Sequence, residues 1–128
     1  MADIAITNSR IAELNAEQTL VFNAATETVK DTAQKFIYTP TGKDNKIVLG
    51  FVNGAGHGAY TYSIAGGVGV FGLSAKTGSI ADGATEIIQI ETGRYMQGNG
   101  TIEITLTPAD GKILATNHAA KMWAIELQ

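Results

Sequence analysis

Residues 44–65 read Asp-Asn-Lys-Ile-Val-Leu-Gly-Phe-Val-Asn-Gly-Ala-Gly-His-Gly-Ala-Tyr-Thr-Tyr-Ser-Ile-Ala, and the rest of the chain is organised around this stretch. Both halves have apolar side chains at every second position: Ile47, Leu49 and Phe51, then Tyr60, Tyr62 and Ile64. This alternation predicts two β-strands, and the three glycines between Asn53 and Gly58 allow the tight turn of a hairpin. Val48 and Val52 add apolar groups on the other face, so we expect the first strand to lie inside a sheet.

The totals favour one all-β domain. A chain of 128 residues is large enough to bury a core, and 45% hydrophobic against 16% charged residues argue against disorder. Fifteen glycines among many Thr, Ile and Val indicate short strands with tight turns. The net charge of −3 argues against a nucleic-acid partner, and the lack of cysteine excludes a disulfide scaffold and cysteine-ligated zinc.

Neither a membrane span nor an export signal is expected. No run approaches the roughly 18 to 20 apolar residues that cross a bilayer. The N-terminus, Met-Ala-Asp-Ile-Ala-Ile, lacks the basic start and long apolar run of a signal peptide. We therefore expect no membrane partner, and synthesis and action without export by that route.

Further strands are predicted along the chain. They are expected at residues 20–22, 36–38, 86–92, 101–107 and 122–127. In 86–92, Ile88 and Ile90 are expected inward and Ile87 outward, and in the last strand Trp123, Ile125 and Leu127 share a face. About seven short strands predict an antiparallel, Ig-like β-sandwich over residues 20–128, with a jelly roll or small barrel as alternatives. Residues 1–19 are expected to form an extended N-terminal arm or a first strand.

No arrangement of residues predicts catalysis, a metal site or a cofactor. Gly67–Gly72 matches G-x-G-x-x-G, but no helix is expected after it, so a glycine-rich β segment is favoured over a phosphate site. His57 and His118 share no ligand-like spacing, which favours solvated histidines. Three glutamates on strands, Glu86, Glu91 and Glu103, are expected on a solvated outer face. We expect that the chain is not an enzyme.

Aromatic residues offer one alternative function. Tyr60, Tyr62, Tyr95 and Trp123 would make a sugar-stacking platform if they were exposed together, although aromatics at strand spacing favour the core. Arg94, next to Tyr95 and just after a strand, is a candidate anchor for a partner, with a pairing inside the chain as the alternative.

Two groups of residues carry a resemblance to a known class of proteins. Phe36-x3-Pro-Thr-Gly-Lys-Asp44-x-Lys46 leads into an apolar strand and Asn53, and Glu91-Thr-Gly-Arg-Tyr95 follows further on, before a final apolar strand. With these features, residues 20–128 resemble small virion structural proteins of tailed bacteriophages, in particular capsid decoration (cement) proteins with an Ig-like β-sandwich.

The resemblance implies a protein made in the host cytoplasm that binds the outer surface of the capsid, with the major capsid protein as partner. A homo-trimer would suit threefold positions of such a shell. We expect partner contacts from the apolar side chains of the N-terminal segment and from two loops: Ile4, Ile6, Ile11, Leu14, Lys43, Arg94 and Tyr95. The alternatives are a carbohydrate-binding or adhesin module and a tail-tube or baseplate subunit.

Overall fold

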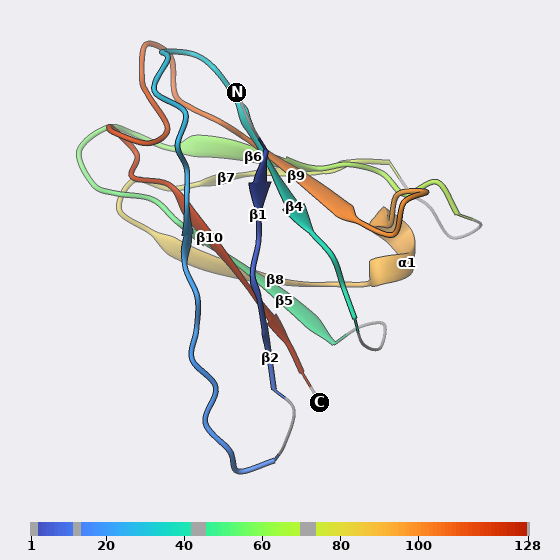
Figure 1. Ribbon diagram of the computed structural model, residues 1–128. Helices are drawn as coiled ribbons and strands as arrows, with labels where there is room; N and C mark the ends of the chain where they lie inside the picture. The colour runs from blue at the N-terminus through green and yellow to red at the C-terminus, as the bar shows by residue number, and fades with distance from the viewer. Residues whose placement is uncertain (1–2, 12–13, 42–45, 70–73, 128) are drawn as a thin grey trace.

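The computed structural model describes residues 3–11, 14–41, 46–69 and 74–127 (Figure 1). Within them it has ten strands and one short helix. The bounds are β1 Ile4–Ala5, β2 Asn8–Arg10, β3 Asn23–Ala24, β4 Gln34–Tyr38, β5 Ile47–Val52, β6 Tyr60–Ile64, β7 Lys76–Ile80, β8 Thr85–Ile90, α1 Thr92–Tyr95, β9 Ile102–Thr107 and β10 Lys121–Glu126.

The strands form two sheets packed face to face, as expected for a sandwich (Figure 1). One sheet has the order β1-β4-β9-β6-β7 and the other β2-β10-β5-β8, with β3 also paired to β10. Neither sheet closes into a barrel, so that alternative is wrong. Both sheets are mixed instead of purely antiparallel, because β1 runs parallel to β4 and β2 parallel to β10.

Residues 47–64 form two strands, β5 and β6, but the two strands do not make a hairpin. β5 pairs with β10 and β8 in one sheet, whereas β6 pairs with β9 and β7 in the other. Alternation predicts only that each strand buries one face. That face is buried equally well whether the two strands are neighbours in one sheet or lie in two sheets that pack against each other. Gly56 and Gly58, at φ 96° and 86°, give the connection between the sheets the left-handed backbone that it needs.

The core lies between the sheets and follows the predicted alternation closely. Phe51 stacks on Tyr62 across the interior, with ring centroids 4.7 Å apart. The largest side chains with almost no exposure come from the inner faces of β4, β5, β6, β7 and β9 and from one loop: Tyr38, Tyr60, Phe36, Phe51, Ile47, Leu49, Ile64, Ile80, Ile102, Ile104, Leu106 and Leu114. Burial of each such side chain stabilises the fold by about 1.5–3 kcal/mol.

Residues 4–10 are part of the fold. β1 joins one sheet and β2 joins the other, so this short segment closes one side of the sandwich. Ile6, between them, is 6% exposed, and its N–H donates to the carbonyl oxygen of Ile37 at 2.8 Å. The opposite side, between β7 and β8, has no such strap among the described residues.

The last strand, β10, and the segment before β3 both differ from the prediction, and the two lie beside each other. Trp123 and Ile125 do share a face, but it is the outer face of β10, because their neighbours Met122 and Ala124 point into the core. The Trp123 ring lies over Gly50, where any side chain would collide with it, and is only 8% exposed. Residues 20–22, expected as a strand, are not one. Instead they belong to a segment beside this outer face, where Leu20 and Ile125 border a small hollow.

Candidate functional site

An N-terminal loop, described at Ile11 and at residues 14–22, lies at one end of the sandwich (Figure 1). Its base is held by three hydrogen bonds. The N–H of Ile11 donates to the carbonyl oxygen of Glu126 at 2.9 Å, and the N–H of Val21 donates to the Ser9 hydroxyl at 3.1 Å. Just outside the loop, the N–H of Thr7 donates to Oδ1 of Asn23 at 3.3 Å. The loop is therefore fixed where it joins the fold.

Apolar side chains of this loop face solvent. Leu14 is 77% exposed and Phe22 is 52% exposed. Of the other apolar residues expected to contact a partner, Ile4 and Ile11 are half-buried. Ile6 is buried in the core cluster, so its predicted availability to a partner is wrong: residues 4–10 pair with both sheets.

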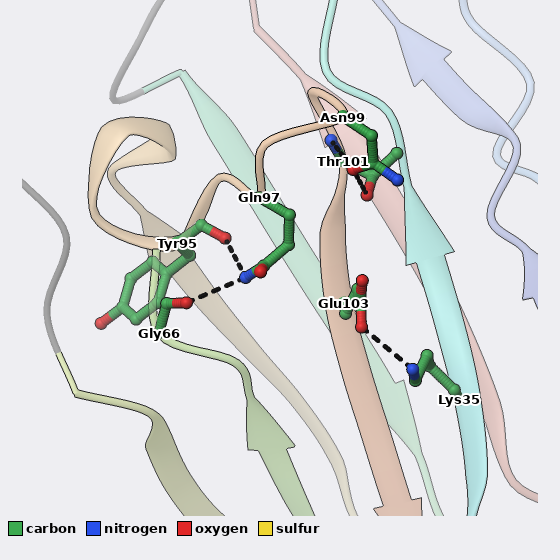
Figure 2. Close-up of polar contacts among 7 residues, drawn as sticks. All are labelled: Lys35, Gly66, Tyr95, Gln97, Asn99, Thr101 and Glu103. Atoms are coloured by element: carbon green, nitrogen blue, oxygen red, sulfur yellow. Dashed lines mark hydrogen bonds and ion pairs between the residues drawn. The ribbon is translucent and has the colours of Figure 1, made fainter. Parts of the chain in front are cut away.

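The second predicted contact region forms a short helix with internal partners. Arg94, in α1, makes an ion pair with Glu91, which is the pairing inside the chain that the sequence left open as an alternative. Tyr95 is half-buried and packs against the core. Nε2 of Gln97 donates to the carbonyl oxygen of Gly66 at 2.9 Å and to that of Tyr95, which ties α1 to the end of β6 (Figure 2). Lys43, the third predicted contact, lies outside the described residues.

A buried carboxylate stands at the base of the N-terminal loop. The side chain of Glu126, at the end of β10, has no exposed surface. One of its oxygens, Oε2, accepts from Asn8 Nδ2 at 2.5 Å, from the Tyr38 hydroxyl at 3.1 Å, and from both the N–H and the hydroxyl of Thr41 at 3.2 and 3.1 Å. These residues, the Glu126 cluster, join β2, β4, β10 and the turn after β4.

Electrostatics in the Glu126 cluster favour the ionised carboxylate. Burial by itself raises the pKa of Glu126, but the hydrogen bonds from Asn8, Thr41 and Tyr38 outweigh it, so that its pKa lies below the ordinary value. The pKa of Tyr38 is raised strongly, by burial first and then by the charge of Glu126. Among the described residues, Glu126 Oε1 and Asn8 Oδ1 are buried without a hydrogen-bond donor.

A second buried polar cluster holds the loops at the other end of β5. Nδ2 of Asn53 donates to three carbonyl oxygens, those of Gly58, Ile80 and Ala81, at 3.0, 3.0 and 3.1 Å. Its Oδ1 lies 3.1 Å from Nδ1 of His118. Asn53 and His118, with these partners, are called the Asn53 cluster below.

His118 is fully buried, so the prediction of a solvated histidine is wrong for it. Its Nε2 accepts from the N–H of Ala109 at 3.1 Å, which leaves the proton on Nδ1 to donate to Asn53. Burial lowers the pKa of His118, and the ring is held neutral. The spacing of histidines in a sequence can indicate a metal site, but it gives no sign of a histidine that is buried and hydrogen-bonded inside the fold.

The Asn53 cluster continues into an exposed carboxylate. Asp82 accepts from the N–H groups of Gly56, His57 and Gly58 at 2.9 to 3.2 Å, and these hydrogen bonds lower its pKa. The glycine-rich connection between the sheets is thus pinned from two sides, by Asn53 and by Asp82. It is a fixed part of the molecule.

A groove of about 360 Å³ lies on the open side, between β7 and β8. Phe51 and Tyr62 form its floor. Lys76 and Glu86 also line it. Glu86 is exposed, as predicted, but it pairs in register with the inward-facing Phe51, so its predicted place on the outer face is wrong. Glu91 is exposed as expected, and Glu103 is half-buried and pairs with Lys35 at 3.0 Å (Figure 2).

The four aromatic residues of the carbohydrate alternative do not form one surface. Tyr60 has no exposed surface, and Trp123 lies on the outer face of the other sheet. Tyr62 is half-buried at the groove, and Tyr95, the last residue of α1, packs against the core. A shared stacking platform is therefore not what the fold builds from them.

No group of three or more metal-ligating residues occurs within the described ranges. No helix in the described part of the chain has the length and apolar character to cross a bilayer. Comparisons with models of protein families, with curated proteins and with solved structures give no match to this chain.

Proposed function

We propose that the chain is a structural binding module whose N-terminal loop docks on an assembled protein shell, as a capsid decoration protein of a tailed bacteriophage does. The observation that carries the proposal is the loop itself: it is fixed at its base to both β2 and β10, yet it presents Leu14 at 77% exposure. Large apolar side chains exposed on one fixed loop, here Leu14 and Phe22, give a partner an apolar surface to bury.

Rigidity supports the same function. The two sheets, the strap over residues 4–10 and the two buried polar clusters hold the loop base and the inter-sheet connection in fixed positions. A pre-organised surface loses little conformational entropy on binding. A module that binds only the assembled shell stabilises each site by RT ln(1 + [L]/Kd), so many weak sites add up to a large effect.

The test is co-sedimentation with shells assembled from the major capsid protein of the same virus, with unassembled capsid protein as the comparison. We expect the chain to pellet with shells and to leave the unassembled protein unbound. A double variant, Leu14→Ser with Phe22→Ser, should lose shell binding by about tenfold or more, the usual effect of removing a buried apolar anchor.

The matched control is Val29→Ser, since Val29 is 60% exposed but lies outside the N-terminal loop. Val29→Ser should bind shells as the parent chain does. Failure of the parent chain to pellet with shells, or equal binding by the double variant, would overturn the proposal. Binding to glycans on an array, with no binding to shells, would favour the adhesin alternative.

A further inference from the structure

The dipeptide Asn-Gly occurs twice in the chain, at residues 53–54 and at residues 99–100. It is chemically reactive, because the backbone nitrogen of the glycine can attack the side-chain amide carbon of the asparagine, and glycine has no Cβ to obstruct the approach. Whether this reaction takes place depends on the surroundings of each asparagine. The two sites differ in their access to water and in the hydrogen bonds that hold the nitrogen atoms involved.

Asn53 is held by the fold on all sides. It is 3% exposed, its Nδ2 donates to three carbonyl oxygens, and its Oδ1 lies next to Nδ1 of His118. The N–H of Gly54 donates to the carbonyl oxygen of His118 at 2.6 Å. The attacking nitrogen and the leaving nitrogen are therefore both fixed, and this pair can react only when the surrounding core opens.

Asn99 lies in an exposed turn between α1 and β9 (Figure 2). Its Nδ2, which would leave as ammonia, makes no hydrogen bond within the described part of the chain. The N–H of Gly100 donates to the carbonyl oxygen of Gln97 at 3.0 Å, and this bond must open before the nitrogen can attack. Because exposed turns open far more readily than cores, the barrier from the fold is small at this site.

Thr101 directs two donors at the amide oxygen of Asn99. Its hydroxyl donates to Oδ1 at 2.6 Å and its N–H at 3.3 Å (Figure 2). Attack by the Gly100 nitrogen places negative charge on Oδ1, and donors that already face this oxygen stabilise the charge. Oδ1 of Asn53 also has a donor, His118, so the contrast between the sites comes from the leaving nitrogen and from access to water.

We propose that Asn99 is a deamidation site, at which the backbone of the chain and water convert asparagine to aspartate and isoaspartate. The Gly100 nitrogen loses its proton to solvent and forms a bond to Cγ of Asn99. The Cγ–Nδ2 bond then breaks, and Nδ2 takes up a proton and leaves as ammonia. Water opens the resulting cyclic imide at either carbonyl carbon. Opening at Cγ gives aspartate, and opening at the backbone carbon gives isoaspartate, whose main chain runs through Cβ.

The two products affect the turn differently. Aspartate keeps an oxygen that accepts from Thr101 and adds a negative charge. Isoaspartate lengthens the main chain inside a turn that is closed by two hydrogen bonds, from Gly100 to Gln97 and from Gln97 to Thr101. Since the side chain of Gln97 also ties α1 to the end of β6, isoaspartate should loosen α1.

Peptide mapping by mass spectrometry tests the assignment, on the pure full-length chain incubated at neutral and at mildly alkaline pH. We expect Asn99 to convert faster than Asn53 by about tenfold or more, because Asn53 reacts only through an open form of the core. The rate at Asn99 should rise with pH, since the attacking nitrogen must be deprotonated. An isoaspartyl methyltransferase should label the product at position 99.

The matched control is the same chain unfolded in urea, where Asn53 and Asn99 should convert at similar rates. Gly100→Ala should slow conversion of Asn99 by about tenfold, in the folded chain and in urea, because a Cβ then obstructs the attacking nitrogen. An unchanged rate in this variant would reject attack by the backbone. Equal rates at Asn53 and Asn99 in the folded chain, or an Asn99 that reacts only in urea, would overturn the proposal.

Discussion

The two buried polar clusters lie at opposite ends of β5 and differ in kind. In the Asn53 cluster, a neutral amide and a neutral imidazole share their hydrogen bonds, and each donor of Asn53 and His118 meets an acceptor. In the Glu126 cluster, one carboxylate oxygen accepts from several donors while the other oxygen has none among the described residues. The first fixes loops to one another, and the second fixes the N-terminal segment with a charge.

The cost of burying polar groups is offset differently in the two clusters. A neutral network is stable wherever every group is paired. A buried carboxylate needs several donors to offset its lost hydration, and those donors come from two separate pieces of the chain, Asn8 and residues 38–41. Loss of Glu126 should therefore loosen the attachment of β2, whereas loss of Asn53 should loosen the loops around the inter-sheet connection.

Among substitutions in the two polar clusters, the largest expected effect is that of Asn53→Ala. It removes a donor from three carbonyl oxygens, of which that of Ala81 keeps the N–H of Ala84, and leaves the Nδ1–H of His118 without an acceptor, so we expect it to lower the free energy of unfolding by about 3–4 kcal/mol. Urea unfolding measures it. The control is Asn99→Ala, at an exposed asparagine whose contacts are local to one turn, with a loss of about 0.5 kcal/mol. Similar losses for both variants would contradict the role given to Asn53.

Glu126→Ala should rank second, with a loss of about 2–4 kcal/mol, because Asn8, Tyr38 and Thr41 lose a common acceptor. Glu126→Gln keeps an acceptor oxygen and should lose less. The control, Glu103→Ala, removes a partly exposed ion pair with Lys35 worth about 0–1 kcal/mol. Limited proteolysis should cut the N-terminal segment faster in Glu126→Ala, and an unchanged rate would contradict its proposed attachment.

The dependence of the unfolding free energy on pH should distinguish the Asn53 cluster from the Glu126 cluster. The folded pKa of His118 lies below its ordinary 6.5, so between these values the unfolded state binds more protons. The contribution of His118 to the free energy of unfolding is therefore complete above pH 6.5 and is lost as the pH falls from 6.5 through the folded pKa. Glu126, with its pKa below 4.5, contributes stability that is lost only at lower pH. In His118→Gln, the slope of unfolding free energy just below pH 6.5 should flatten, and a slope as steep as that of the parent chain would contradict the assignment.

The smallest expected effects on stability are those of substitutions at the exposed apolar residues of the N-terminal loop. Leu14→Ser and Phe22→Ser should each change the free energy of unfolding by less than about 0.5 kcal/mol, because both side chains are already in solvent. Ile6→Ala, in the same segment but buried, should lose about 2–5 kcal/mol. Equal losses at positions 6 and 14 would mean that the segment is not divided in this way.

Sequence patterns predicted the positions of the strands far better than they predicted which strands pair with one another. Alternation located β4, β5, β6, β8, β9 and β10, and the outward position of Ile87, because burial of one face imposes a period of two. It did not show that β5 and β6 belong to different sheets, since both arrangements bury the same face. The outer-face burial of Trp123 depends on Gly50 and on a segment distant in sequence, which no local pattern reveals.

The candidate site was predicted in part for the same reason. Exposure of Leu14 agrees with its lack of a strand pattern, whereas Ile6 is buried by pairing with strands at residues 34–38 and 121–126, far along the chain. The buried roles of His118 and Glu126 had no sequence signal, because a polar residue in a core is recognised only by its distant partners. The Ig-like topology, the trimer and the virion location remain predictions.

Hydrogen exchange of backbone amides, with and without assembled shells, tests most directly whether one segment both completes the fold and docks. In the free chain, the amides of Ile6 and Ile11 should exchange as slowly as those of β5, and residues 14–20 should exchange rapidly. Added shells should slow exchange in residues 14–22 alone. Rapid exchange at Ile6 and Ile11 in the free chain, or protection by shells elsewhere with none in the N-terminal loop, would contradict this division.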